Sequence, residues 1–358
     1  MHHQLANLTL YRHIIDDKVV RLLSGITRAI ESGDHDLHDL VDPLHSAIHL
    51  LVNFAARLGL SGNLWQNYLC YLIASDENAF SLSHERQHPR ESSINVLARI
   101  DMATLQELIK LNLKPFANML HPEIRNELMN FSGPTVGNDC LWHAKNRLSE
   151  LITQLCQAEN SEMMLKYVAD YHARYGVGMF GLSNSFRVRI IHHDVSFEMI
   201  ANPAEIVLDD LVGYDNQKER LVKNTESFLR GLRANNLLLY GDSGTGKSTC
   251  IKAIQHMYRD RGLVVIEVNK NQLQYFPSII NMIKNRNYRF IIFMDDLSFD
   301  DGESEFKYLK ALIEGGIETM PDHILIYATS NRRHLVKENW TDRTDMVREG
   351  DDIHYSDT

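Results

Sequence analysis

Apolar residues recur every three to five positions through most of the first half of the chain. From Leu10 to Ile30 they fall on one face of a predicted helix that ends near Gly33. A second helix is predicted to begin at Pro43 and to end near Gly59. The same spacing continues in four further segments, which are residues 64–74, 94–111, 141–155 and 162–175. Because the strict alternation of half-buried strands is rare here, the pattern predicts an all-α N-terminal domain.

The second half of the chain has a different pattern, in which short apolar runs alternate with helical segments. Four runs are predicted as strands, at residues 237–240, 263–268, 290–294 and 324–328, and we expect the first and third to be buried. Helices are predicted at residues 216–229, 247–260, 277–284 and 303–314. This alternation indicates a parallel α/β sheet. We therefore divide the chain into a helical domain at 1–193, a linker at 194–207, an α/β core at 208–340 and an acidic, poorly ordered tail at 341–358.

Length and composition narrow the class of protein. With 358 residues, the chain is long enough for two domains. No run of 18 apolar residues occurs and the N-terminus is polar, so we expect neither a membrane span nor a signal peptide. The four cysteines lack metal-ligand spacing and are expected to be reduced thiols of a cytoplasmic protein. The formal net charge of -10 gives no support for a surface that grips nucleic acid, although a local basic patch would allow it.

The first predicted strand leads directly into GDSGTGKST, which contains the spacing G-x-x-x-x-G-K-S. Such glycines let backbone N–H groups turn inward around a phosphate, and the helix that follows adds the positive end of its dipole. Lys247 is expected to reach the β- and γ-phosphate oxygens, and the Ser248 hydroxyl to bind Mg²⁺. The predicted phosphate-binding residues are Gly241, Asp242, Ser243, Gly244, Thr245, Gly246, Lys247, Ser248 and Thr249. A glycine-rich turn without a ligand would match this spacing and context only by a rare coincidence.

Polar residues follow two of the other predicted strands. The third strand ends in Asp295 and Asp296, at the edge of the sheet where a triphosphate would lie. Asp295 is expected to hold Mg²⁺ through its water shell, and Asp296 to orient or deprotonate the attacking water. After the fourth strand, Asn331 is the first candidate for a hydrogen bond to that water or to the γ-phosphate. Ser330 or Thr329 could take this role instead.

Three weaker patterns in the sequence each allow more than one interpretation. Val212 and Gly213, upstream of the phosphate loop, could contact adenine or serve packing alone. His45 and His49 have the spacing of metal ligands on a helix, but two histidines do not fill a coordination sphere. The glycines of residues 176–181 match G-x-G-x-x-G, but they follow a helix and not a strand. We interpret them as a helix terminator and turn.

The order of strand, phosphate loop, acidic pair and asparagine resembles the core of AAA+ ATPases across roughly residues 208–345. The resemblance rests on the segments LDDLVGYDNQKE, GDSGTGKST, FIIFMDDLSF, EGGIE and ILIYATSNRRHL. These are similar to a bacterial family of AAA+ proteins that carry a variable helical N-terminal domain. The resemblance implies an α/β nucleotide-binding domain with strand order 1-4-3-2, binding of ATP and Mg²⁺, hydrolysis, and assembly into rings or filaments. It implies no particular client.

Two features depart from the AAA+ pattern. Many AAA+ enzymes have Asp-Glu where this chain has Asp295 and Asp296, and aspartate is one methylene shorter. AAA+ proteins also continue past the fourth strand with an arginine finger, a fifth strand and a helical lid, whereas this chain runs into its acidic tail. We expect the fifth strand to be absent, which leaves strand 237–240 on an exposed edge unless a segment such as 186–193 covers it. The chain is then a truncated product or differs in activity from its relatives.

The leading functional hypothesis is an ATPase that couples hydrolysis to remodelling or loading of an unknown macromolecular client read by the helical domain. The alternative is a nucleotide-dependent binding or switch protein with little or no hydrolysis. A small-molecule kinase fits less well, because no lid arginines are visible. Self-association is expected if the lid exists, and nucleic-acid loading has no support from the charge. Arg332 and Arg333 could contact phosphate or a neighbouring subunit, or form a solvated pair.

Overall fold

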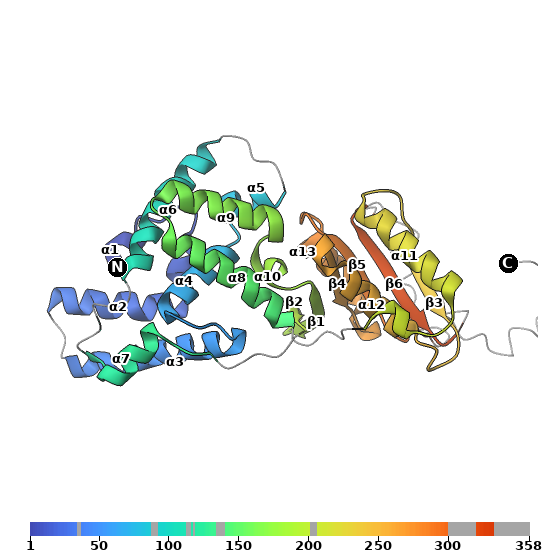
Figure 1. Cartoon of the computed structure of the whole chain (residues 1–358), viewed down its shortest axis with the longest axis horizontal. Coiled ribbons are helices and arrows are strands. Elements are labelled where there is room, and N and C mark those ends of the chain that lie inside the picture. Colours follow the sequence, from blue (N-terminus) through green and yellow to red (C-terminus); the bar gives the residue numbers. More distant parts are fainter. Residues whose placement is uncertain are drawn as a thin grey trace, which may run out of the picture.

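The computed structural model describes residues 1–33, 37–86, 92–111, 116, 119–133, 140–200, 206–299 and 320–332. Its first part is helical, as predicted (Figure 1). The helices are α1 (His2–Leu5), α2 (Lys18–Ser32), α3 (Val41–Leu58), α4 (Leu64–Ser75), α5 (Ala79–Glu85), α6 (Ser93–Leu111), α7 (Pro122–Met129), α8 (Cys140–Gln157), α9 (Ser161–Tyr175) and α10 (Gly178–Leu182). None of the helices within these ranges is long and apolar enough to cross a membrane.

Local signals in the sequence set the ends of the first helices. The helix predicted from residue 10 is divided, because the Asp17 carboxylate caps the first turn of α2 and leaves a separate 3₁₀ helix at Arg12–Asp16. Gly33 and Gly59 terminate α2 and α3 in the left-handed conformation, with φ of 69° and 62°. Both predicted stops are confirmed.

The second part of the chain is a six-stranded sheet with helices on both faces. Its strands are β1 (Ser185–Ile191), β2 (Asp194–Met199), β3 (Leu237–Tyr240), β4 (Leu263–Glu267), β5 (Arg289–Met294) and β6 (Ile324–Ser330), and its helices are α11 (Asp215–Leu229), α12 (Lys247–Tyr258) and α13 (Phe276–Ile283). The strand order is β2-β1-β4-β5-β6-β3, and every pair except β1–β2 is parallel. Apolar side chains of α11 and α12 pack on one face of the sheet, and those of α10 and α13 on the other.

The hairpin β1–β2 corrects the predicted domain boundary. We placed residues 186–193 in the helical domain and began a linker at residue 194, but both strands belong to the sheet. Phe186 and Val188 point inward from β1, Phe197 does so from β2, and all three are buried. β1 pairs in parallel with β4, so burial of these side chains in the sheet core fixes the hairpin there. The helical domain therefore ends near residue 183, before β1.

The phosphate-loop strand lies at the opposite edge of the sheet. Among the described residues β3 pairs only with β6, so the four predicted strands have the expected order 1-4-3-2. We expected β3 to be buried, but Leu238 and Tyr240 are 36% and 54% exposed, because an edge strand is covered on fewer sides. The hairpin β1–β2, which contains residues 186–193, pairs at the β4 edge of the sheet. It therefore does not cover β3. The predicted helix 303–314, the tail 341–358 and any fifth strand lie outside the described residues.

The helical domain contacts the sheet at the end of the strands away from the phosphate loop. Figure 1 shows α10 and the hairpin β1–β2 between the helices and the rest of the sheet. Residues 176–181 form part of this contact and not a nucleotide site. Gly176 ends α9 with φ of 85°, as the helix-terminator interpretation predicts, and a Cβ added there would overlap the Tyr288 side chain.

Candidate nucleotide-binding site

The phosphate loop lies where β3 ends and α12 begins. Gly244 and Gly246 have φ of 78° and 82°, a backbone conformation that residues with a side chain rarely adopt. The Gly241 N–H donates to the Ser330 carbonyl of the neighbouring strand at 3.3 Å, which ties the start of the loop to the tip of β6. α12 begins at Lys247, so its N-terminal N–H groups face the loop. Residues 242–244 are exposed, and the loop is open to solvent.

The Lys247 ammonium lies folded onto its own loop. It donates to the carbonyls of Gly241 at 2.8 Å and Asp242 at 2.7 Å, and to the Asn331 side-chain oxygen at 3.0 Å. These acceptors hold the cation over the space that the loop encloses. A phosphate oxygen placed there would be a stronger acceptor than either carbonyl, because it carries charge.

The Ser248 hydroxyl donates to Asp295, as expected for two groups that share a metal ion. The Thr329 hydroxyl, which is buried, donates to the same carboxylate at 2.6 Å and accepts the Asp296 backbone N–H at 2.8 Å. Thr329 thus connects both aspartates to β6. We had considered it only as an alternative to Asn331, and its contact with the acidic pair was missed.

Asp296 is the second acidic residue, and its backbone has φ of 52°. Aspartate and asparagine tolerate this left-handed conformation better than most residues do, because their short side chains can hydrogen-bond locally. This gives a conformational reason for aspartate where many AAA+ enzymes have glutamate. The Asn331 amide donates to the Asp296 carboxylate at 2.8 Å. Strain held at such a position is typical of functional sites.

The three polar residues at the tip of β6 therefore have separate contacts. Thr329 meets Asp295, and Asn331 meets both Lys247 and Asp296. The Ser330 hydroxyl accepts the Arg332 backbone N–H at 3.1 Å and contacts neither aspartate. Arg333 lies outside the described residues. Asn331 is consequently the one of the three that faces the phosphate loop with its side chain.

The segment before α11 lies beside the loop. Leu211 contacts Gly246 so closely that a Cβ added to this glycine would be 3.0 Å from the leucine methyl. The Lys218 ammonium donates to the Leu211 carbonyl at 2.8 Å and holds the segment in place. Val212 follows with 94% of its surface exposed, and Gly213 has φ of 83°. An apolar side chain so exposed next to a phosphate loop is free to contact a ligand, whereas packing within the protein does not account for it.

The other predicted ligand sites have simpler explanations. The His49 ring nitrogen shares a hydrogen bond with Asn53 at 2.9 Å. No group of three potential metal-binding side chains occurs in the part of the chain that the structure describes. We therefore place the candidate chemistry of the protein at the phosphate loop.

One protein-family model matches the second part of the chain. Residues 183–358 match the model of a family described as "Protein of unknown function (DUF815)". The match begins just before β1, so it covers the sheet with its phosphate loop, acidic pair and order 1-4-3-2. The described residues of this region have the fold and the motif order of an AAA+ domain. The helical domain before residue 183 lies outside the match.

Two of the solved structures that align with part of the chain serve as examples. Both are of the Holliday junction branch migration motor RuvB from Thermotoga maritima, one of them a mutant, at 18% sequence identity and a TM-score of 0.29. Each alignment covers 37% of this chain and 43% of the motor, so the chain spans less than half of that protein's length. No curated protein matches the chain.

The AAA+ domain has two oxygen donors that suit Mg²⁺. A hydroxyl from Ser248 and a carboxylate from Asp295 are hard oxygen ligands, and both lie at the mouth of the loop. Their direct hydrogen bond shows that the two side chains converge on one point. Ser248 and Asp295 therefore fit a Mg²⁺ ion held together with phosphate oxygens and water.

Proposed function

We propose that the AAA+ domain binds ATP with Mg²⁺ and hydrolyses it. The observation that supports this most directly is the hydrogen-bonded chain from Lys247 through Asn331 to Asp296. It links the group expected to bind phosphate with the group expected to act on water. A protein that only bound a nucleotide would need Lys247 to contact the phosphates, but it would not need Asp296 to act on water.

Each side chain has a role in the proposed reaction. Lys247 would exchange its carbonyl acceptors for β- and γ-phosphate oxygens. Mg²⁺, when bound by Ser248 and Asp295, would neutralise charge on these phosphates. Asp296 would accept a hydrogen bond from the attacking water and orient it in line with the γ-phosphate. Asn331 already donates to Asp296 and would hold its carboxylate in place.

The adenine would lie against the segment before α11. Val212 would supply an apolar contact, and Gly213 would let the backbone approach the ring closely. The proposal for these two residues is supported by the exposure of Val212 and by the contact of Leu211 with the loop.

ATP binding and turnover of the full chain test this function. We expect Lys247→Ala to weaken ATP binding at least tenfold, whereas Lys252→Ala, an exposed lysine of the same helix, should leave it unchanged. Asp296→Asn should preserve binding and lower turnover by about a hundredfold or more, because a positioned base contributes that much. Equal ATP affinity of the Lys247→Ala and Lys252→Ala proteins would contradict the assignment of the loop.

A switch protein without hydrolysis is the second candidate. It is favoured by the aspartate at position 296, whose carboxylate reaches less far than that of glutamate and is engaged by Asn331. In this case the wild-type chain would bind ATP tightly and show no turnover, even at concentrations that allow self-association. Asp296→Asn would then change neither quantity.

The helical domain is the proposed reader of the client. We propose that nucleotide turnover in the AAA+ domain drives remodelling or loading of a macromolecule in the cytoplasm, with self-association into a ring or filament. The support for this proposal is the resemblance of residues 208–345 to AAA+ proteins and the firm contact between the two domains. The charge of the chain favours a protein client over nucleic acid.

A further inference from the structure

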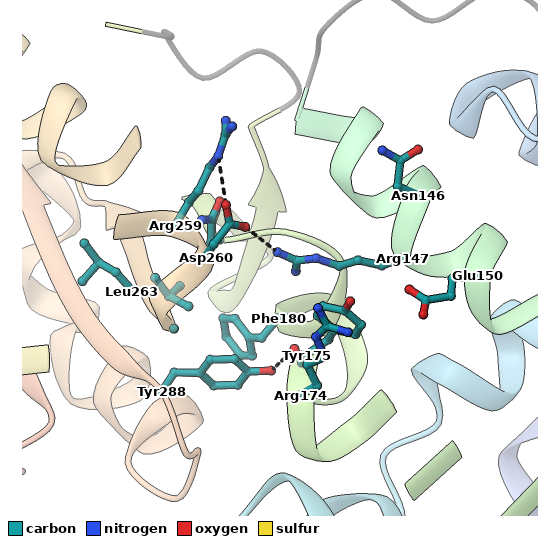
Figure 2. A pocket seen from close by; sticks show the side chains of 13 residues that line it. Asn146, Arg147, Glu150, Arg174, Tyr175, Phe180, Arg259, Asp260, Leu263 and Tyr288 are labelled. Atoms are coloured by element: carbon teal, nitrogen blue, oxygen red, sulfur yellow. Dashed lines mark hydrogen bonds and ion pairs between the residues drawn. The ribbon is translucent and has the colours of Figure 1, made fainter. Parts of the chain in front are cut away.

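A cavity lies at the junction of the two domains, away from the phosphate loop. Its volume is about 320 Å³, near the lower limit of small-molecule sites at ~300 Å³. The walls come from α8, the C-terminal end of α9, α10, the residues that directly follow α12, and the start of β4. We call it the junction pocket, and its polar side chains include Arg147, Glu150, Arg174, Arg259 and Asp260. Figure 2 shows Arg147 extending from α8 toward Asp260 of the nucleotide domain.

Two arginines of the junction pocket share one aromatic support. The guanidinium groups of Arg147 and Arg174 lie 4.8 Å and 4.9 Å from the centre of the Tyr175 ring. Stacking on the ring restrains the planes of both guanidinium groups. Within the described residues, Arg174 has no hydrogen bond or ion pair, and its donors face solvent.

The polar contacts of Arg147 with the protein are long. Arg147 reaches Asp260 at 3.4 Å and the Gly181 carbonyl at 3.5 Å, both at the limit of a hydrogen bond. Asp260 is 68% exposed and is also paired with Arg259 at 3.8 Å. Because Asp260 is exposed and its contact with Arg147, whose side chain is 18% exposed, is long, an anionic ligand could replace this carboxylate as the partner of Arg147.

Charge in the junction pocket favours an anion. Three arginines face two carboxylates, those of Glu150 and Asp260, in a chain whose net charge is -10. Guanidinium groups match phosphate oxygens with paired hydrogen bonds, and the side-chain amides of Asn146 and Asn184 add further donors.

We propose that the junction pocket binds a phosphate-bearing small molecule, with Arg147 and Arg174 as its principal contacts. The pocket is distinct from the phosphate loop. Arg259 and Asp260 directly follow α12, and Lys247 begins it, so the two sites lie at opposite ends of one helix of 12 residues, about 18 Å long. Binding at the pocket does not depend on ATP binding at the loop.

Calorimetric titration of the full chain tests this proposal, with inorganic phosphate, pyrophosphate and adenosine monophosphate as separate probes. To exclude the phosphate loop, each probe is titrated into the Lys247→Ala protein. We expect saturable binding there and at least a tenfold loss of affinity when Arg174→Ala is added. Arg174 is exposed, so its removal should not disturb folding. The matched control is Arg28→Ala, an exposed arginine of α2, which should bind as before.

The probes also separate the sources of the phosphate group. Tighter binding of the monophosphate nucleotide than of free phosphate would indicate a nucleotide ligand, and equal binding would indicate the anion alone; both results support the pocket. Absence of saturable binding to the Lys247→Ala protein would overturn the proposal. The same holds if affinity survives combined Arg147→Ala and Arg174→Ala changes in a protein that circular dichroism shows to be folded. A failure of ATP hydrolysis would leave this result unaffected.

Discussion

The hydroxyl of Thr329 is a single group on which both aspartates of the site depend. It donates to the Asp295 carboxylate and accepts the Asp296 backbone N–H, and Thr329 is only 1% exposed. Valine has nearly the same shape without the hydroxyl, so Thr329→Val would leave two partners in this buried corner without their hydrogen bond. Loss of a hydrogen bond to a charged group costs about 1.5–3 kcal/mol, which corresponds to roughly tenfold or more in affinity.

We therefore expect Thr329→Val to reduce the gain in ATP affinity that Mg²⁺ provides by about tenfold, and to leave Mg²⁺-free binding unchanged. The measurement is ATP affinity with and without Mg²⁺, which does not require hydrolysis. Thr329→Ser keeps the hydroxyl and should behave like the wild type. If the serine and valine variants lost the same Mg²⁺ dependence, the hydroxyl would not be the cause.

A second residue, His172, makes stability depend on pH. Burial lowers the pKa of this histidine from 6.5 to about 4, with the nearby His84 acting in the same direction and a hydrogen bond to the Gly176 carbonyl at 3.3 Å opposing it. Between pH 6.5 and pH 4, His172 therefore binds a proton in the unfolded chain but stays neutral in the folded chain. Stability is complete above pH 6.5 and falls as pH drops toward 4, by at most roughly 3 kcal/mol.

Urea unfolding of the wild type and of His172→Leu at pH 7 and pH 5 measures this effect. The leucine variant should lose less stability than the wild type between the two pH values, whatever its stability at pH 7. The comparison removes the contributions of the other titrating groups, which both proteins share. Equal losses would show that His172 is accessible to protons in the folded chain.

At the scale of elements, local signals explain what the sequence could predict. Gly33 and Gly59 end helices through their own backbone conformation, so their effect is readable without the rest of the fold. The hairpin β1–β2 was assigned wrongly because its place depends on β4, whose paired residues come 80 positions later in the chain. Its turn at His192 and His193 has φ of 49° and 71° and lacks the glycine that usually indicates a tight hairpin.

The candidate site likewise has one part that could be predicted from the sequence and one part that could not. The phosphate loop could be predicted because glycines, lysine and serine act through one continuous segment. The tip of β6 could not be resolved, because three consecutive polar residues are equivalent in sequence. Successive residues of a strand point to opposite sides, so Thr329 and Asn331 face the acidic pair while Ser330 turns to Arg332. Only the pairing of β6 with β5 determines which side faces the aspartates.

At the scale of the whole molecule, β5 connects the helical domain to the site. Its C-terminal end carries the two aspartates. Just before its N-terminal end, Arg286 enters the helical domain, where its side chain is 7% exposed. The guanidinium donates to both oxygens of Glu85 at 2.8 Å, to Glu77 at 2.7 Å and to the Val177 carbonyl at 2.7 Å. Tyr288 adds a hydrogen bond from its hydroxyl to the Tyr175 carbonyl at 3.0 Å.

This joint combines the ion pairs of Arg286 with the apolar packing of α10, whose buried Phe180 lies in the core of the sheet. The Glu85 side chain is 2% exposed and also accepts the Val177 N–H at 3.0 Å, so it is a buried anion whose counter-ion comes from the other domain. A buried carboxylate without a partner is strongly unfavourable. The ion pair therefore ties the residues just before β5 to α5 of the helical domain.

Arg286→Ala should consequently destabilise the chain by about 3–5 kcal/mol, because it leaves Glu85 buried and unpaired. The matched control is Arg189→Ala, which removes an arginine paired with Glu198 at 2.6 Å on the open surface of β1 and should shift the urea midpoint little.

Combining Arg286→Met with Glu85→Leu removes both charges and should recover much of the lost stability. If Arg286→Ala unfolded at the same urea concentration as Arg189→Ala, the ion pair would not hold the domains together. Hydrogen exchange gives the location: opening confined to α5 and residues 284–288 is expected, since those segments meet at this joint.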